Sequence, residues 1–181
     1  MSAPRGPETL TTGRLLLRRG RSTDAEAIFR RYASDPEVTR LVGWPRHTRL
    51  EDTRGFLEFD AGAWERSPAG GYLIESRATG ALLGSTGFLF ETPYRAMTGY
   101  VLARDAWGLG YASEALGAIV EAAPPLGVRR LFAVCHHEHR ASARVLEKCG
   151  FAFEGVLRRY AVFPNLDPLE PQDVLCYAMM P

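Results

Sequence analysis

Residues 107–114 read WGLGYASE, and this stretch decides more about the fold than any other part of the chain. It follows a strand-like apolar segment and opens a segment whose apolar residues have helical spacing. Gly108 and Gly110 let the backbone approach a ligand closely, while Ala112 and Ser113 keep the start of the helix small. The free N–H groups of a first helical turn, together with the helix dipole, form an anion site. The stretch therefore predicts a loop that binds phosphate or pyrophosphate.

Two familiar phosphate loops do not fit this stretch. A P-loop would need Gly-x-x-x-x-Gly-Lys-Ser/Thr, and no such lysine is present. A dinucleotide fingerprint would place its glycines after a first strand, with an acidic residue about 20 positions later at a strand end. Here Ser113 replaces the third glycine, and the strand predicted at residues 130–135 runs into cysteine and histidine. A bare Gly-x-Gly also fits a tight turn that binds nothing, so the loop alone leaves both interpretations open.

Outward from the loop, apolar periodicity and turn residues predict an α+β chain. Two helices are predicted to begin at Ser/Thr-x-x-Glu capping boxes, Thr23–Glu26 and Thr48–Glu51, and two more cover residues 111–123 and 140–149. Strands are predicted at residues 15–17, 71–76, 81–90, 98–103, 130–135, 151–157 and 174–180. Close turns make residues 71–103 an antiparallel meander. No repeat or linker interrupts this order, so we expect one domain over residues 1–181, with residues 1–10 as a flexible tail.

Composition narrows the class of protein further. Twenty-two Lys and Arg against 21 Asp and Glu give a net charge of +1, which offers no basic face for nucleic acid. The opening residues lack the apolar run of a signal peptide, and no stretch approaches the roughly 20 apolar residues of a membrane span. Three widely spaced cysteines form no disulfide framework. We therefore expect a soluble cytoplasmic protein without a nucleic-acid or membrane partner.

The segment AVCHHEH at residues 133–139 holds three of the four histidines and suggests a metal site. Cys135, His137 and His139 nevertheless have no fourth ligand at a recognisable zinc spacing. The alternative is that Cys135 closes a strand and the histidines begin the turn into the next helix. We predict no metal.

The loop resembles the pyrophosphate loop of the GNAT acetyltransferases, whose pattern is Arg/Gln-x-x-Gly-x-Gly/Ala, with Trp107 in the Arg/Gln place. The continuation GYASEA is similar to the subgroup that acetylates N-termini of ribosomal proteins. Residues 12–18, TGRLLLR, are similar to the opening strand of that subgroup. Residues 142–151, SARVLEKCGF, are similar to its second signature, and Phe153-Glu154-Gly155 follows as expected. The resemblance covers nearly the whole chain.

The resemblance implies a GNAT fold, α+β in an α/β/α arrangement, with a mixed, mostly antiparallel sheet and helices on both faces. The sheet would splay between the fourth and fifth predicted strands, and acetyl-CoA, as co-substrate, would lie in that gap. Its pantetheine would pair with the backbone of Tyr100, Val101 and Leu102, and an N–H near Leu102 would polarise the thioester. Its pyrophosphate would bind the amides of Gly108, Leu109, Gly110, Tyr111, Ala112 and Ser113.

The same resemblance implies direct attack by a primary amine in a ternary complex. Many GNAT enzymes place a tyrosine as general acid where this chain has Leu146. Ser142 is then the candidate acid, although a serine that only caps the helix is the alternative. His139 stands where relatives carry an asparagine that contacts pantetheine, and is both a cofactor-binding and a candidate acid–base residue. As bases, Glu75 and Glu91 are open candidates beside the central strands.

The sequence leaves the acceptor less defined than the donor. The subgroup favours a protein N-terminal α-amine, while an aminoglycoside, a polyamine, an amino acid or another small-molecule amine is the alternative. A non-catalytic acyl-CoA-binding module is a further alternative. We expect Trp44 and residues 163–171 to contribute to the acceptor wall, and we expect a monomer or homodimer.

Overall fold

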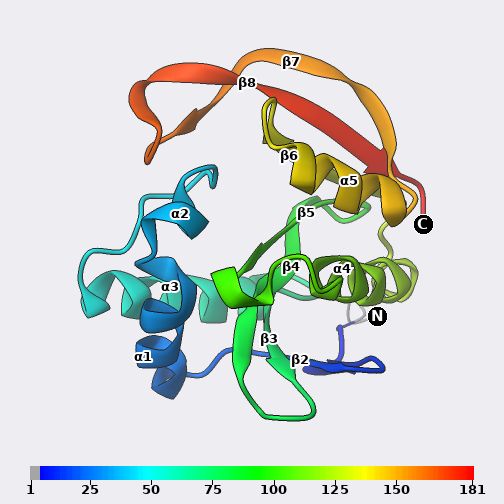
Figure 1. Cartoon of the computed structure of the whole chain (residues 1–181). Coiled ribbons are helices and arrows are strands. Elements are labelled where there is room, and N and C mark those ends of the chain that lie inside the picture. The colour runs from blue at the N-terminus through cyan, green and yellow to red at the C-terminus, as the bar shows by residue number, and fades with distance from the viewer. Residues whose placement is uncertain (1–4) are drawn as a thin grey trace.

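A computed structural model describes residues 5–181 and contains one eight-stranded sheet of order β1-β2-β3-β4-β5-β6-β8-β7 (Figure 1). The strands are β1 (Thr9–Thr11), β2 (Leu15–Arg18), β3 (Gly71–Ser76), β4 (Leu82–Thr92), β5 (Arg95–Leu102), β6 (Arg130–His136), β7 (Ala152–Phe163) and β8 (Asp167–Met179). The helices are α1 (Ala25–Ile28), α2 (Pro36–Thr39), α3 (Leu50–Arg66), α4 (Tyr111–Ala122) and α5 (Arg140–Lys148), with a π-helix at Phe29–Ala33 and 3₁₀ turns at Ser22–Asp24, Arg104–Ala106 and Pro124–Leu126. The predicted α+β class and the mostly antiparallel sheet are confirmed.

The sheet parts between β5 and β6, the fourth and fifth strands of the prediction. These two strands are parallel and pair only where Arg95–Met97 lies beside Arg130–Phe132. Beyond Met97, β5 stays paired with β4, and β6 stays paired with β8, so the two halves of the sheet diverge (Figure 1). The predicted splay is confirmed.

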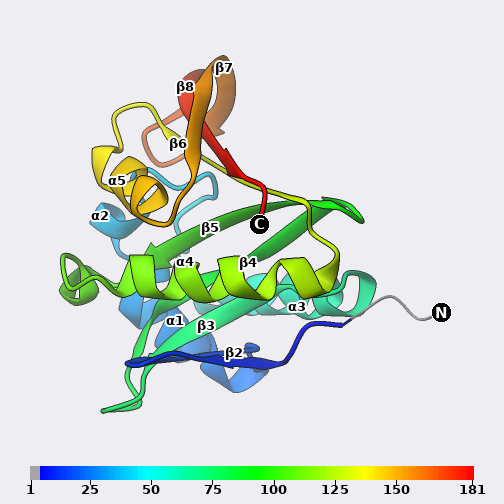
Figure 2. The same ribbon diagram turned by 90° about the vertical axis from the view of Figure 1, so that its right-hand side faces the viewer.

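Helices cover both faces of the sheet, as predicted. Helix α4 packs on β2, β4 and β5 from one side, and α1 and α3 pack on β3 and β4 from the other (Figure 2). Helix α5 packs on β6 and β7 beyond the gap. The apolar spacing of α4 buries Ala115, Leu116 and Ile119 in the main core.

Both predicted capping boxes are displaced, the first toward the N-terminus, to Arg21 and Asp24, and the second toward the C-terminus, to Arg49 and Asp52. The backbone N–H of Arg21 donates to Asp24 (2.7 Å), and that of Arg49 donates to Asp52 (3.0 Å). In both boxes an aspartate accepts the backbone N–H of the N-cap residue, the role that the prediction assigned to Glu26 and Glu51. Its short side chain reaches back over one turn as well as glutamate does, so the pattern alone did not separate them.

The prediction of a flexible tail at residues 1–10 is wrong for residues 5–10. Residues 1–4 lie outside the residues that the structure describes. The guanidinium of Arg5 donates to the carbonyl of Trp64 (2.7 Å), and the hydroxyl of Tyr72 donates to the carbonyl of Pro7 (2.7 Å). Strand β1 then pairs with β2, from Thr9 opposite Arg18. These partners come from distant parts of the chain, which explains why a polar, Pro-rich segment is ordered.

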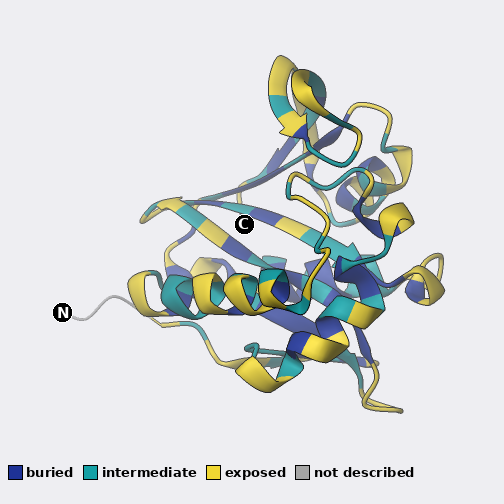
Figure 3. Cartoon of the chain, turned by 90° about the vertical axis from the view of Figure 1, so that its left-hand side faces the viewer, coloured by how far each residue is buried: buried dark blue, intermediate teal, exposed yellow. Residues whose placement is uncertain are grey.

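The predicted loop at residues 163–171 is instead the end of a long β7–β8 hairpin that arches over the gap (Figure 1). Pro168 and Pro171 lie within β8, before its pairing with β6 begins at Val174. One edge of β8 is unpaired there, and proline is tolerated at such an edge because no ladder donor is lost. Exposed residues run along the outer part of the hairpin (Figure 3).

Within residues 5–181, none of the helices is long and apolar enough to cross a membrane.

Candidate active site

The gap between β5 and β6 exposes backbone groups of β5. The N–H of Ala103 donates to the carbonyl of Leu83 on β4 (2.7 Å). Antiparallel pairs alternate in direction, so Val101 also turns its backbone to β4, whereas Tyr100 and Leu102 turn theirs toward β6. Of the three residues predicted to bind pantetheine through the backbone, Tyr100 and Leu102 are thus oriented for it. Val101 is not, because its backbone faces Ser85 of β4.

The carbonyl of Leu102 already has a partner. The indole N–H of Trp107 donates to it (2.8 Å), which fixes the start of the glycine loop against the end of β5. The N–H of Leu102 faces the same gap. This geometry fits the predicted role of an N–H near Leu102 at a thioester carbonyl.

The glycine loop ends at the first turn of α4. Gly108 has a φ of 73° and Gly110, the residue before the helix, has a φ of 82°. Both values lie in the left-handed region that glycine tolerates. The carbonyl of Gly110 accepts the N–H of Glu114 (3.1 Å), so the N–H groups of residues 111–113 have no acceptor within the helix. These are the amides to which the prediction assigns the pyrophosphate.

Arg14 holds this loop in place, a role that sequence reasoning missed. Its guanidinium donates to the carbonyl of Leu109 (3.0 Å) and to the carboxylate of Glu114 (2.7 Å). The same group lies 4.5 Å from the ring centre of Tyr111. Arg14 therefore places a half-exposed positive charge beside the anion site. Only the tertiary contact between β2 and α4 reveals it.

Ser142 does not cap α5, so the capping interpretation of this residue is wrong. The helix begins after His139, whose carbonyl accepts the N–H of Ala143 (3.2 Å). The hydroxyl of Ser142 lies 2.9 Å from the hydroxyl of Tyr100, which also donates to the carbonyl of Ser142 (3.0 Å). Burial raises the pKa of Tyr100 above its ordinary value, so this hydroxyl keeps its proton. The side chain of Tyr100 thus positions Ser142.

A cavity of about 480 Å³, which we call the central cleft, brings several predicted residues together. Tyr100, Val101, His139 and Ser142 all line it, with Leu146 at the position where the resemblance would expect a tyrosine acid. Burial lowers the pKa of His139, so its imidazole is neutral at neutral pH and can accept or donate one hydrogen bond. Leu146 is buried and apolar, which leaves Ser142 as the hydroxyl of α5 in the cleft.

The two predicted carboxylate bases lie outside the cleft. Glu75 accepts from the guanidinium of Arg18 (2.6 Å), and Glu91 pairs with Arg95 (2.8 Å) near the β4–β5 turn. Neither residue lines the central cleft or its neighbouring cavity. Their charges are compensated by arginines, so the structure argues against both as bases.

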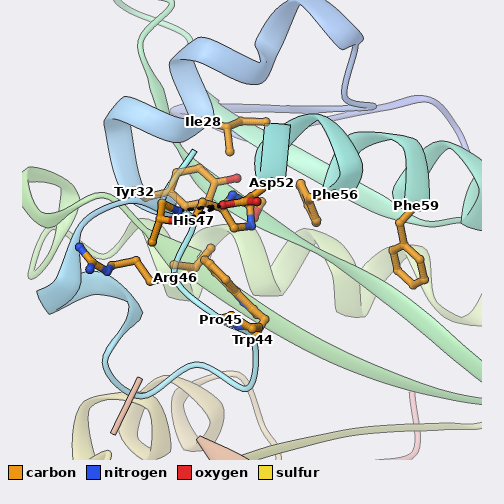
Figure 4. A pocket seen from close by; sticks show the side chains of 12 residues that line it. Ile28, Tyr32, Trp44, Pro45, Arg46, His47, Asp52, Phe56 and Phe59 are labelled. Carbon is orange, nitrogen blue, oxygen red and sulfur yellow. Dashed lines mark hydrogen bonds between the residues drawn. The ribbon is translucent and has the colours of Figure 1, made fainter. Parts of the chain in front are cut away.

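A second cavity of about 810 Å³, which we call the aromatic cavity, adjoins the central cleft (Figure 4). Five residues line both: Trp44, Phe56, Phe59, Ser85 and Val101. The remaining walls come from the end of α1, its π-helix, the loop before α3 and the first turn of α3. Trp44 lies at the boundary between the two cavities, so a substrate that passes from the aromatic cavity into the central cleft would contact it. Sequence reasoning singled out Trp44 but not the other walls, because they come from separate elements.

The β7–β8 hairpin secures the loop that carries Trp44. The side-chain amide of Asn165 donates to the carbonyls of Thr39 (2.7 Å) and Trp44 (2.9 Å) and accepts the N–H of Arg46 (2.7 Å). Phe163, at the end of β7, lines the central cleft. The hairpin thus reaches the Trp44 loop through Asn165 in its turn and the central cleft through Phe163, while residues 167–171 of the predicted loop belong to β8.

The AVCHHEH segment is the end of β6 and the turn into α5. His136 is buried, and its ring lies 4.5 Å from that of His137 and 4.8 Å from that of Phe163. Cys135 lines the central cleft, and burial raises its pKa to about 11. Across residues 5–181, the structure gathers no three His, Cys, Asp or Glu side chains in a way that would hold a metal ion.

A sheet that parts beside a glycine loop at a helix N-terminus defines the class of acyl-CoA-dependent acetyltransferases. Residues 14–152 match the family model described as "Acetyltransferase (GNAT) domain". The chain therefore belongs to the GNAT acetyltransferase family, and it is an enzyme of that family.

Relatives and solved structures agree with this assignment. The chain is 37% identical over 164 residues to "Uncharacterized N-acetyltransferase YoaA" of Bacillus subtilis (strain 168), covering 89% of this chain and 92% of the relative. It is similar to a GNAT-family acetyltransferase from Bacillus anthracis, with a TM-score of 0.82, 28% identity and coverage of 95% and 98%. RimL, described as a ribosomal L7/L12 alpha-N-protein acetyltransferase in complex with coenzyme A, has the same fold, with a TM-score of 0.83, 24% identity and coverage of 96% and 98%.

Proposed function

We propose that the protein transfers the acetyl group of acetyl-CoA to a primary amine, and that this amine is the N-terminal α-amine of a polypeptide. The observation that supports acetyl-CoA as the donor is the gap between β5 and β6. There the edge of β5 at Tyr100 and Leu102 has no neighbouring strand, and it runs toward the amides of the glycine loop, with only the carbonyl of Leu102 taken by the indole of Trp107. An extended pantetheine and a pyrophosphate would match these two features in one molecule.

In this proposal the amine attacks the thioester directly, with both substrates bound. The N–H of Leu102 would hold the oxyanion of the tetrahedral intermediate. The amine loses a proton to attack, and the sulfur of CoA gains one as it leaves. Ser142, held by Tyr100, would donate that proton to the sulfur and be reprotonated by solvent.

The bases that line the central cleft are weak, which favours an α-amine over a lysine side chain. They are His139, whose pKa is lowered by burial, and Asp60, whose pKa is raised by burial and which accepts the N–H of Gly71 (2.7 Å). An α-amino group has a pKa of about 7.7–8.0 and a lysine amine about 10.4, so roughly a tenth of the α-amine is already unprotonated at neutral pH. The fold shared with RimL, whose description names a protein α-amine, is consistent with this choice.

The charge around the aromatic cavity argues against polyamines and aminoglycosides. A polycation would need several free carboxylates, whereas the cavity is lined by one carboxylate, Asp52, and one guanidinium, Arg46. The carboxylate is engaged by the backbone N–H groups of Thr48 (2.9 Å) and Arg49 (3.0 Å). An amino acid or another small-molecule amine with a single charge is the remaining alternative acceptor.

Two peptides of one sequence, each with a single internal lysine, test the proposal. One has a free α-amine and the other an acetylated N-terminus, and release of CoA thiol is followed with acetyl-CoA present. We expect thiol release with the free peptide alone. Release with the blocked peptide would overturn the α-amine assignment, and turnover of a small-molecule amine without turnover of either peptide would favour a small-molecule acceptor.

A further inference from the structure

The aromatic cavity lies directly beyond the point where the acceptor amine must meet the thioester. Because it shares Trp44, Ser85 and Val101 with the central cleft, a molecule whose amine is in the cleft extends into the cavity. Its volume of about 810 Å³ is within the usual range of small-molecule pockets. The side chain of a small first residue, such as serine or alanine, would leave most of this space unfilled.

The walls of the cavity are suited to a planar apolar group. The rings of Trp44 and His47 lie 5.3 Å apart, and those of His47 and Phe56 lie 6.3 Å apart, all three tilted against one another. Ile28 closes the cavity from α1, and Phe59 lies toward its mouth with 63% of its surface exposed (Figure 4). Aromatic surfaces of this kind bind other rings in offset or edge-on contacts.

The hydroxyl of Tyr32 in the cavity wall lacks a well-formed partner. Tyr32 is 2% exposed, and its hydroxyl faces the side chain of Ser85, but this contact does not meet the distance and angle of a full hydrogen bond. A buried hydroxyl without a full partner is unfavourable, so such a group needs an explanation. Burial raises the pKa of Tyr32 above its ordinary value, which keeps the hydroxyl protonated and able to donate.

The backbone places Tyr32 in this position by a local irregularity. Residues Phe29–Ala33 form a π-helix, and the N–H of Ser34 donates to the carbonyl of Phe29 five residues earlier (3.2 Å). A π-turn inserts one residue relative to an α-helix and rotates the following side chains. Such turns are frequent at functional sites, which is consistent with a ligand role for Tyr32.

We propose that the acceptor amine carries an aromatic ring that binds in the aromatic cavity, with an oxygen on that ring accepting the hydrogen of the Tyr32 hydroxyl. The inference rests on the proposed acetyl transfer to a primary amine. It deepens that proposal by naming the group next to the amine. A peptide that begins with tyrosine and a small phenolic amine share this chemistry.

The first experiment compares acceptors on the full chain at saturating acetyl-CoA, with kcat/KM measured by CoA thiol release. The small amines are tyramine, phenethylamine and spermidine, and the peptides share one sequence but begin with Tyr, Phe, Ser or Ala. We expect the Tyr peptide to exceed the Ser and Ala peptides by about tenfold or more. We expect tyramine to exceed phenethylamine by about tenfold, since one hydrogen bond contributes about that much.

The second experiment repeats the tyramine-to-phenethylamine ratio in Tyr32→Phe, which removes the hydroxyl and keeps the ring. The ratio should fall to near one, while Tyr94→Phe, on the exposed β4–β5 turn, should leave it unchanged. The ratio is an internal control, because a general loss of folded protein lowers both rates equally. A wild-type ratio near one, or an unchanged ratio in Tyr32→Phe, overturns the inference.

The outcomes also separate this inference from the proposed function. Preference for Ser and Ala peptides would overturn the aromatic acceptor and leave N-terminal acetylation intact. Turnover of tyramine without turnover of any peptide would overturn the N-terminal acceptor and support the cavity assignment. If no amine is turned over, calorimetry of tyramine with the CoA-saturated protein decides, and an absence of binding overturns the inference.

Discussion

The contact between the hydroxyls of Ser142 and Tyr100 is the residue-level feature on which the proposed proton transfer to CoA depends. A serine hydroxyl on the third residue of a helix would ordinarily turn to the backbone, but here it lies 2.9 Å from a tyrosine hydroxyl on β5. The contact crosses the gap between the two halves of the sheet. It therefore fixes Ser142 relative to the β5 backbone on which the thioester would be held.

Replacing Ser142 by alanine is expected to lower kcat by about 10²-fold, the lower end of the range for general acid–base groups. The KM for acetyl-CoA should change little, because the pyrophosphate loop is untouched. Tyr100→Phe should lower kcat by a smaller factor, since Ser142 remains but is less well positioned. Steady-state kinetics check both variants, and unchanged turnover in Ser142→Ala would remove this residue from the mechanism.

The loop before α4 would bind pyrophosphate through its backbone amides and not through its side chains. Positive φ values at Gly108 and Gly110 turn the amides of the first helical turn outward, and Arg14 ties the loop to β2. The side chains of Trp107 and Leu109 remain exposed. Amides arranged in this way can bind an anion without any contribution from the side chains between the glycines.

Gly110→Glu is expected to abolish acetyl-CoA binding, because it places a carboxylate where the pyrophosphate would bind. Gly80→Glu is the matched control. Gly80 also has a positive φ, of 70°, and lies exposed in the β3–β4 turn, so both variants carry similar backbone strain of about 1–2 kcal/mol. Calorimetry should show binding in the control alone. Normal binding by Gly110→Glu would show that the pyrophosphate lies elsewhere.

The β7–β8 hairpin is a second element with a defined task, since Asn165 holds the loop carrying Trp44 by three hydrogen bonds. Asn165→Ala is expected to raise the KM for the amine by about tenfold, because each lost bond contributes about 1 kcal/mol to the order of that loop. The KM for acetyl-CoA should stay constant.

The matched control for Asn165 is Gln172→Ala on the same hairpin, where the amide bonds only to the nearby carbonyl of Glu170 (3.1 Å). It should leave both KM values unchanged. Equal effects of the two variants on the amine KM would mean that the hairpin acts through general stability and not through the Trp44 loop.

At the scale of the whole molecule, two histidines at the junction of β6 and α5 link stability to pH: His136, which is buried, and His139, which is partly buried. Burial lowers the pKa of both His136 and His139, whereas in the unfolded chain each titrates near its ordinary value of 6.5. Below that pH the unfolded state takes up protons first, so the free energy of unfolding must fall. Stability linked to these groups is complete above about pH 6.5 and is lost as the pH falls toward their folded-state pKa values.

Denaturant titrations at pH 7.5 and pH 5.5 are therefore expected to show a lower free energy of unfolding at the acidic value. His139→Gln, which removes one of the two groups without adding charge, should reduce the difference between the two pH values. A difference that is as large in His139→Gln as in the wild type would assign the effect to other groups.

Much of the donor side could be predicted from the sequence because it depends on local physics. The glycines of residues 108–110, the helical spacing of α4 and the Gly150 stop of α5, with a φ of 84°, all act within a few residues. Short-range patterns of this kind leave a readable signal, and the element order followed from them. The opening strand at residues 15–17 and the strands before the loop were placed in the same way.

The acceptor side was decided only by the tertiary structure. Tyr32, Trp44, His47 and Phe56 come from a π-helix, a loop and a helix, and Asn165 reaches them from the far end of the chain. No local pattern encodes such contacts, because each depends on how distant elements pack. For the same reason the sequence suggested Glu75 and Glu91 as bases, whereas arginines from β2 and β5 neutralise them in the folded chain. The sequence by itself determined the glycine loop and the strand edge that would hold acetyl-CoA, because both depend on backbone conformation set by neighbouring residues. Long-range packing decided which side chains line the aromatic cavity on the opposite side.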